Sequence, residues 1–109
     1  MYKIIITELA ERDVEQTARY IAKELQNPIA ANRLLDDIES AVASLETMPK
    51  RYALVKNEDL ANLGFRLLVI HNYLIFYIVR EDKKTVTIER FLHSRRDWIH
   101  IIGEQKPPA

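Results

Sequence analysis

The chain contains no cysteine, only two glycines and no long apolar run, and each absence excludes a class of structure or chemistry. Without cysteine there is no disulfide framework, no thiolate metal site and no cysteine nucleophile. Gly64 and Gly103 cannot make the glycine-rich loop that cradles phosphates in nucleotide-binding proteins. The longest apolar run, at residues 73–79 with both tyrosines counted, has seven residues, whereas a membrane-spanning helix needs about 20.

The start of the chain lacks the pattern of a secretory signal. After Lys3, only residues 4–6 are apolar before polar residues interrupt the run, which is too short for a signal-peptide core. We therefore expect a soluble cytoplasmic protein that does not enter a membrane. Its 109 residues suit one domain, which we place at residues 1–104, followed by a tail at residues 105–109.

The charges balance in sum but not along the chain. Sixteen basic and sixteen acidic residues give a formal net charge of zero. Residues 8–48 carry nine acids and four bases, residues 49–109 carry eleven bases and seven acids, and Lys3 completes the balance. A neutral total argues against an extensive contact with nucleic-acid phosphates. Two interpretations of this asymmetry are left open. One is a local basic patch in the second half, and the simpler one is two solvated faces of opposite sign.

The first half has the periodicity of one short strand followed by two helices. The β-branched residues 2–7 predict the strand. Apolar residues then recur at steps of three and four over residues 8–26, with Thr7 as the predicted N-cap. A second helix is predicted over residues 28–48, with Asn27 as its N-cap and proline as its first residue. Two long helices joined by one turn predict an antiparallel hairpin.

The second half changes to the pattern of a small sheet. Residues 50–63 have no clean period and predict a loop with one short turn. Three strands of an antiparallel meander are predicted, over residues 65–71, 73–80 and 85–92. Ser94 is the predicted N-cap of a final short helix, with Asp97 in the capping-box position.

The predicted order is therefore β-α-α-β-β-β-α, which is an α+β fold class. A helical hairpin and a small sheet each have an apolar surface that must be buried. We expect the hairpin to pack on one face of a small antiparallel sheet, with the short helix at the C-terminus. We expect the other face of the sheet to stay partly open as a concave surface on which a partner would act.

Searches for familiar catalytic and metal-binding patterns find little. The three histidines, at positions 71, 93 and 100, lack the i, i+4 spacing of a zinc-binding helix, so no metal site is expected. The three serines, at positions 40, 44 and 94, lack the motif of an activated nucleophile. No cofactor is expected.

One polar cluster stands out at the end of the last predicted strand. Alternation places Val86, Ile88, Arg90 and Leu92 on one face, and Thr87, Glu89, Phe91 and His93 on the other. His93 is followed closely by Arg95 and Arg96, and Arg66 lies on the first strand of the meander. Arginines grouped with a histidine can bind a phosphodiester and move a proton during RNA cleavage. The structural alternative is that Arg90 pairs with an acidic residue and that Asp97 caps the helix.

Short motifs in a fixed order run through nearly the whole chain. They are TELAERD at 7–13, YIA at 20–22, NP at 27–28, AA at 30–31, Leu45, MP at 48–49, GFR at 64–66, NYLIFY at 72–77 and IERFLHSRRD at 88–97. This ordered set resembles the RelE/ParE superfamily, the toxins of bacterial type II toxin–antitoxin modules. The resemblance implies the same fold that the periodicity predicts.

The resemblance also implies a partner, a small cognate antitoxin that holds the toxin inactive. Its C-terminal segment is expected to fold against a groove of the toxin. Two modes of contact stay open: a basic antitoxin segment on the acidic surface of residues 8–48, or apolar groove filling. Growth inhibition and plasmid stabilisation are further expectations from this resemblance.

Two activities occur in the superfamily, and the resemblance is closer to the ParE branch. RelE-like members cleave mRNA on the ribosome through basic residues on the sheet, whereas ParE-like members lack that set and act on DNA gyrase. Arg66 matches one of the basic positions, but Leu68 and Leu74 stand at two others, and Ile101 stands near the place of a late aromatic. Replacing an arginine by leucine removes a phosphate clamp. We therefore expect binding to gyrase, with no catalytic residue.

The predicted target-binding residues are Arg66, Tyr73, Tyr77, Arg90, His93, Arg95 and Arg96. Tyr73 and Tyr77 share a strand face and could form part of a binding surface, although aromatic strand residues more often serve packing. The alternative is an endoribonuclease acting on ribosome-bound mRNA, for which Arg66, His93 and Arg95 would be catalytic. A further alternative is a non-toxic module that only binds a partner protein.

Overall fold

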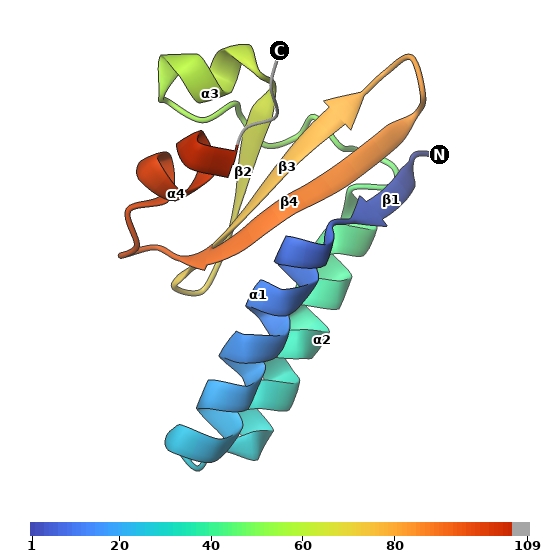
Figure 1. The fold of residues 1–109 in the computed structure, drawn as a ribbon. Coiled ribbons are helices and arrows are strands. Elements are labelled where there is room, and N and C mark those ends of the chain that lie inside the picture. The colour runs from blue at the N-terminus through green and yellow to red at the C-terminus, as the bar shows by residue number, and fades with distance from the viewer. Residues whose placement is uncertain (106–109) are drawn as a thin grey trace.

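The computed structural model describes residues 1–105 and has the predicted order of elements, with one short helix added in the loop before the meander (Figure 1). The elements are β1 (Lys3–Ile6), α1 (Glu8–Arg19), the π-helical segment η1 (Tyr20–Glu24), α2 (Pro28–Ser44), α3 (Glu58–Asn62), β2 (Phe65–Ile70), β3 (Tyr73–Arg80), β4 (Thr85–His93) and α4 (Trp98–Gln105). The predicted tail at 105–109 therefore starts inside α4, and its last four residues lie outside the described part of the chain.

The four strands form one sheet in the order β1-β4-β3-β2. Strands β2, β3 and β4 form the predicted antiparallel meander. Strand β1 pairs in parallel with β4, from Lys3 opposite Thr85 to Ile6 opposite Ile88. The sheet is thus antiparallel except at this pair. Parallel neighbours need a crossover connection, and here the helical hairpin and the first two meander strands supply it.

Two side-chain caps fix where the helices of the hairpin begin. Thr7 Oγ1 accepts a hydrogen bond from the N–H of Ala10 at 3.1 Å, and Asn27 Oδ1 accepts one from the N–H of Ala30 at 3.1 Å. Both caps were predicted from the sequence. Such caps satisfy backbone donors that the first turn of a helix leaves unpaired.

The cap of the last helix differs from the prediction. Asp97 Oδ1 accepts a hydrogen bond from the N–H of His100 at 3.3 Å, and α4 begins one residue after Asp97. Asp97 is therefore the cap, and the prediction of Ser94 is wrong. The N–H of Ser94 donates instead to the carbonyl of Asn72 at 2.8 Å. This bond ties the turn after β4 to the turn between β2 and β3.

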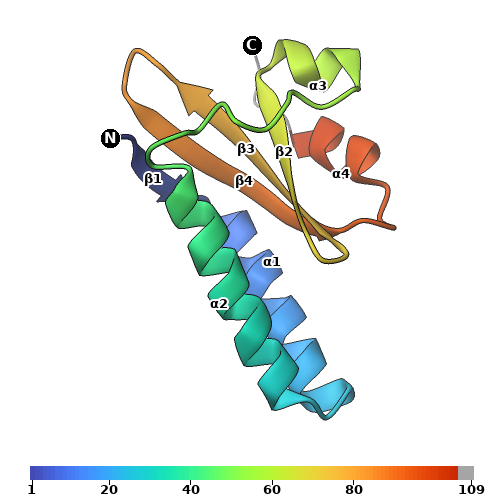
Figure 2. The same ribbon diagram turned by 180° about the vertical axis from the view of Figure 1, so that it is seen from behind.

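The first helix changes its hydrogen-bond pattern before it ends. The N–H of Leu25 donates to the carbonyl of Tyr20, five residues back, at 3.2 Å. The predicted helix over residues 8–26 is thus α-helical in α1 and π-helical in η1. Figures 1 and 2 show that this end of the hairpin extends well beyond the sheet.

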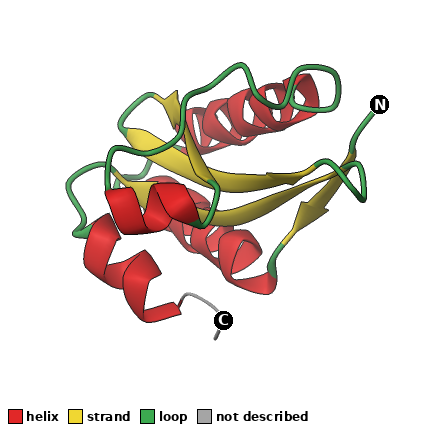
Figure 3. Ribbon diagram, turned by 90° about the horizontal axis from the view of Figure 1, so that it is seen from above, coloured by secondary structure: helices red, strands yellow, loops and turns green. Residues whose placement is uncertain are grey.

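The sheet buries apolar side chains on both faces. On the hairpin side, the sheet residues Leu68, Ile75, Tyr77, Val86 and Phe91 belong to one core with Ala10 of α1, Leu34 of α2 and Leu45 after α2. On the other side, the sheet residues Phe65, Leu74, Phe76 and Leu92 belong to a second core with Leu60 of α3 and with Trp98 and Ile102 of α4. Helices on both sides of the sheet are visible from above (Figure 3). The expectation of an open concave face is therefore wrong where α3 and α4 cover it.

A β-bulge alters the side-chain alternation of β4. Phe76 of β3 pairs with Arg90, whereas its neighbour Tyr77 pairs with Ile88, so Glu89 is the extra residue. Ile88 and Phe91 consequently pack in the same core, on the hairpin side. Leu92 packs instead on the side of α3 and α4, so the prediction that Leu92 shares the face of Ile88, and Phe91 the other, is wrong beyond the bulge.

None of the helices described in residues 1–105 combines the length and the apolar character that crossing a membrane requires.

Candidate target-binding site at the end of β4

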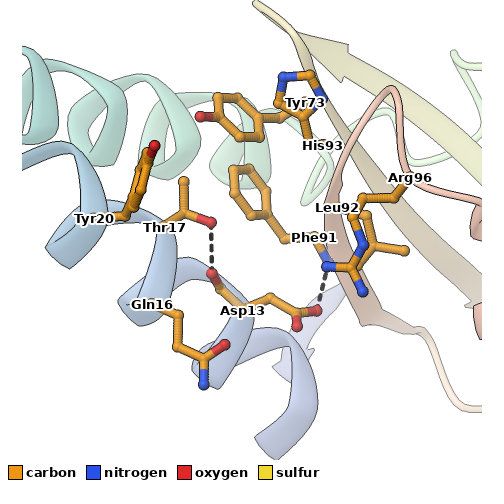
Figure 4. Close-up of a pocket in the computed structure, with 9 residues that line it drawn as sticks. All are labelled: Asp13, Gln16, Thr17, Tyr20, Tyr73, Phe91, Leu92, His93 and Arg96. Carbon is orange, nitrogen blue, oxygen red and sulfur yellow. Dashed lines mark hydrogen bonds between the residues drawn. The ribbon is translucent and has the colours of Figure 1, made fainter. Parts of the chain in front are cut away.

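A cleft of about 250 Å³ opens between α1 and the ends of β3 and β4 (Figure 4). Asp13, Gln16, Thr17 and Tyr20 form a helix wall. Tyr73, Phe91, Leu92 and His93 form a sheet wall, and Arg96 of the turn after β4 completes the lining. Three of the predicted target-binding residues, Tyr73, His93 and Arg96, therefore meet at one site.

Aromatic rings form the sheet wall of this cleft. The ring of Tyr73 stacks on Phe91, with centroids 5.0 Å apart and planes at 16°. It also meets the ring of His93 edge-on, at 5.3 Å and 80°. Burial, and to a smaller extent the nearby Tyr20, raise the pKa of the Tyr73 hydroxyl. The hydroxyl thus stays protonated at neutral pH and can donate a hydrogen bond to a ligand.

The turn after β4 fixes His93 and projects two arginines. The N–H of Arg95 donates to His93 Nδ1 at 3.1 Å, and the N–H of Arg96 donates to the His93 carbonyl at 3.0 Å. Since Nδ1 accepts, a neutral His93 carries its proton on Nε2. Arg95 and Arg96 are exposed, and neither forms an ion pair with another described residue. Two cations are therefore available at this end of β4.

Arg90 was predicted to bind a target, with pairing to an acidic residue as the structural alternative, and the structure shows the pairing. Its Nε and Nη2 donate to the two carboxylate oxygens of Asp13 at 2.7 and 2.9 Å. The side chains of Arg90 and Asp13 are only 10% and 13% exposed. The N–H of Phe91 donates to the same carboxylate at 3.1 Å (Figure 4). This bidentate pair joins α1 to β4, and Arg90 faces Asp13 rather than solvent.

Tyr77 was also predicted as a target-binding residue, and burial excludes this. Its exposed fraction is 0%, and its hydroxyl donates to the carbonyl of Pro49 at 2.7 Å. Burial raises the pKa of Tyr77 to about 12, because it disfavours the charged phenolate. The packing interpretation of Tyr77 is therefore confirmed, and its hydroxyl anchors the segment that follows α2.

Arg66 lies apart from the cluster at the end of β4. Its Nη1 donates to the carbonyl of Tyr52 at 2.7 Å and to that of Lys50 at 3.5 Å, which holds the loop before α3. Arg66 stands opposite Tyr77 in the sheet, whereas His93 stands opposite Tyr73. Four residues along a strand span about 13 Å. The structure therefore brings His93 and Arg95 together but leaves Arg66 elsewhere.

The aliphatic residues at the expected cationic positions belong to the core. Leu68 is buried on the hairpin side of the sheet, and Leu74 is buried on the side of α3 and α4. Ile101 packs against that second cluster. Phosphate-binding cations at these positions would lie inside the protein. Residues 1–105 also contain no group of three or more side chains placed to hold a metal ion.

Sequence analysis missed the helix wall of the cleft. Gln16, Thr17 and Tyr20 follow Asp13 at spacings of three, four and seven residues, which places them on one face of the helix. The apolar stripe of this helix predicts its core-facing side and says nothing of the cleft. The polar and aromatic side chains on a second face of this helix are the sequence signal from which the helix wall could have been predicted.

The fold of the chain is similar to those of two solved structures. It is similar to a solved structure of the chromosomal ParDE system of Pseudomonas aeruginosa, with a TM-score of 0.69 and 21% identity over 85% of this chain and 96% of that one. It is also similar to the RelBE2 toxin–antitoxin complex of Mycobacterium tuberculosis, with a TM-score of 0.54 and 20% identity over 84% and 96% of the two chains. At such identity these likenesses show the fold alone.

The sequence, rather than the fold, assigns the family. Residues 4–98 match the family model of the ParE toxin of the type II toxin–antitoxin system parDE. The chain belongs to the ParE toxin family, as its motifs predict. A comparison with curated proteins gives no match.

Proposed function

We propose that this protein inhibits growth by binding DNA gyrase in the cytoplasm, without cutting RNA, and that a cognate antitoxin neutralises it. Membership of the ParE toxin family supports a toxin of a type II module. The observation that carries the proposal is the cleft at the end of β4. It joins aromatic rings and Arg96 at one accessible site, with Arg95 adjacent in the chain, and neither arginine forms an ion pair within residues 1–105. Two cations of an RNA-cleaving set, by contrast, are replaced by core leucines.

The chemistry of this cleft suits binding to a protein surface. Tyrosine and arginine are the residues that contribute most often to binding energy at protein interfaces. Tyr20 is 56% exposed on the helix wall, Tyr73 is held in place by stacking on Phe91, and Arg96 lines the cleft, with the exposed Arg95 next to it in the chain. Such a surface favours a target that offers acidic groups beside an apolar or planar side chain.

RNA cleavage is the second candidate, and one observation favours it. His93 lies in the same turn as Arg95 and Arg96 and accepts the N–H of Arg95 at Nδ1, and a histidine near cations can move a proton during phosphodiester cleavage. Arg66 lies about 13 Å along the sheet from this histidine. Its guanidinium holds backbone carbonyls of the chain's own loop. The residues of a phosphodiester clamp are therefore not assembled.

The antitoxin is proposed because similar folds are solved as toxin–antitoxin systems, ParDE and RelBE2. By this proposal the chain is held inactive until its partner is removed. A chain that binds such a partner but has lost toxicity is the remaining alternative, and only a growth experiment separates it.

Expression without the antitoxin tests the proposal in one culture. Plasmid supercoiling reports on gyrase, and primer extension on abundant transcripts reports on RNA cleavage. We expect growth arrest with loss of negative supercoils and intact transcripts. Transcripts cut at codon-defined positions, with supercoiling unchanged, would identify an endoribonuclease. Normal growth would identify a non-toxic binding module.

A further inference from the structure

A second hollow adjoins the cleft and shares a wall with it. It has a volume of about 220 Å³ and lies between η1, α2, the turn from β2 to β3, and Tyr73. Tyr73 lines the cleft as well (Figure 4), and Tyr20 of the cleft is followed in η1 by Ile21 of the hollow. Pockets that hold separate small ligands usually measure about 300–1,000 Å³. The smaller hollow therefore suits a side chain of a molecule that already lies in the cleft.

An arginine without a partner lines this hollow. Arg33 of α2 is exposed and forms no ion pair with another residue of 1–105. Apart from His71, the rest of the lining is apolar or aromatic: Ile21, Ala30, Leu34 and Tyr73. A guanidinium beside such a surface favours a ligand group that joins a carboxylate to an apolar chain.

The contact of Asp37 explains why Arg33 has no partner. Asp37 follows Arg33 by four residues on α2, the spacing at which opposite charges pair along a helix. Its Oδ2 lies instead 2.7 Å from Nε2 of His71, in the turn between β2 and β3. The backbone of His71 is left-handed, with φ of 53°, a conformation that histidine adopts more readily than most residues. His71 thus holds the carboxylate that would otherwise neutralise Arg33.

Positive charge therefore lies at both ends of one aromatic surface. Arg33 lines the hollow, Arg96 lines the cleft with Arg95 next to it, and Tyr73 lines both. None of the three arginines forms an ion pair within residues 1–105. A second copy of the chain on this surface would bring its own three cations to the same place, and like charges repel at an interface. The charge therefore disfavours self-pairing and favours an acidic partner.

We propose that the hollow is a second subsite of the target-binding surface, in which Arg33 binds an acidic side chain of a target segment that also contacts Arg95 and Arg96. The inference rests on the proposed function, in which the cleft binds the target. It adds the chemistry of that target: a segment with acidic groups at two places and an apolar side chain between them, which packs beside Tyr73. His71 is a positioning residue, because it acts on target binding through Asp37.

Two readouts test the subsite: inhibition of purified gyrase, and growth arrest on expression without the antitoxin. Arg33→Glu is expected to need at least fivefold more protein for the same inhibition of supercoiling, and to weaken growth arrest. Arg12→Glu is the matched control and should behave as the wild type, because Arg12 is an exposed arginine of the same hairpin that lines neither the cleft nor the hollow. Thermal melting verifies that both variants fold.

The contact of His71 with Asp37 gives a test that separates charge from structural support. His71→Asn keeps a residue that tolerates left-handed backbone and releases Asp37 to pair with Arg33. It is expected to weaken inhibition about threefold, the scale of one exposed ion pair. Asp37→Asn should inhibit at least as strongly as the wild type, and adding it to His71→Asn should restore inhibition. If the contact only held the turn in place, both single variants would weaken inhibition alike.

The outcomes separate this inference from the proposed function. Wild-type potency of Arg33→Glu in both readouts, or equal losses in His71→Asn and Asp37→Asn, would overturn the subsite. A wild-type chain that arrests growth but leaves gyrase active would contradict the proposed target alone, and weaker arrest by Arg33→Glu would still support the subsite. A wild-type chain that neither arrests growth nor inhibits gyrase would contradict both.

Discussion

Among individual side chains, Asp13 and Arg90 determine how α1 lies against the sheet. Each is largely buried, and the carboxylate also receives the N–H of Phe91, whose ring forms the wall of the cleft. One carboxylate thus positions both the helix and the aromatic surface. A buried ion pair contributes little net stability, but removal of one partner leaves the other as an unpaired buried charge.

Asp13→Asn is accordingly expected to lower the free energy of unfolding by about 3–5 kcal/mol, because Arg90 loses its counter-charge. Urea denaturation measures this change. Glu15→Gln is the matched control, since Glu15 pairs with Arg19 on the exposed surface of the same helix and should cost less than about 1 kcal/mol. Equal losses in the two variants would show that the Asp13–Arg90 pair does not hold α1.

Glu89, the extra residue of the bulge, is half-buried, and burial raises its pKa although Arg80 partly opposes this. A raised carboxyl pKa means that the folded state favours the protonated form. Its contribution to stability is present below the usual pKa and is lost as the pH rises through the folded-state pKa. Glu89→Gln should therefore raise the melting temperature at pH 7, with a smaller gain near pH 4. A gain that grows toward pH 4 would contradict this.

Among helices and strands, the sequence predicted what depends on local chemistry. The Thr7 and Asn27 caps, the hairpin and the three meander strands follow from neighbouring residues and appear in the structure. The bulge at Glu89 was missed because simple alternation assumes an unbroken ladder. Pairing of Arg90 with an acidic residue was the structural alternative, but its partner Asp13 lies 77 positions away, so no local pattern identifies it.

The packing of the short helices α3 and α4 on the sheet could not be predicted either, because it also depends on residues far apart in the chain. The apolar residues Trp98, Ile101 and Ile102 were visible in the sequence, but the surface that they cover depends on the whole fold. The cluster at the end of β4 was found in part. Tyr73, His93 and Arg96 do meet, whereas burial removes Tyr77 and the sheet register separates Arg66.

The cap at the start of α2 offers a test of an element boundary. Asn27→Ala removes the acceptor for the N–H of Ala30 and should lower the free energy of unfolding by about 1 kcal/mol. Asn32→Ala, at an exposed position within α2, should be neutral or slightly stabilising, because alanine is the better helix former. Chemical denaturation compares the two. A loss in Asn32→Ala as large as that in Asn27→Ala would rule out the cap as the cause.

Across the whole molecule, α1 separates two surfaces of different chemistry. The cleft on one side has aromatic walls and lies beside Arg95 and Arg96, and a groove between β1, α1 and α2 on the other side is lined by apolar residues and by Glu11, Glu39 and Glu46. The zero net charge of the chain conceals this contrast. The two surfaces therefore differ in charge as well as in shape.

Inhibition of supercoiling by the purified chain tests the proposed action most directly. Wild-type protein should inhibit purified gyrase, and the double variant Arg95→Glu, Arg96→Glu should need at least tenfold more protein for the same effect. Lys56→Glu with Lys83→Glu, exposed positions outside the cleft, should match the wild type. Full supercoiling activity in the presence of the wild-type chain, together with cleavage of ribosome-bound mRNA by the same preparation, would contradict the proposal.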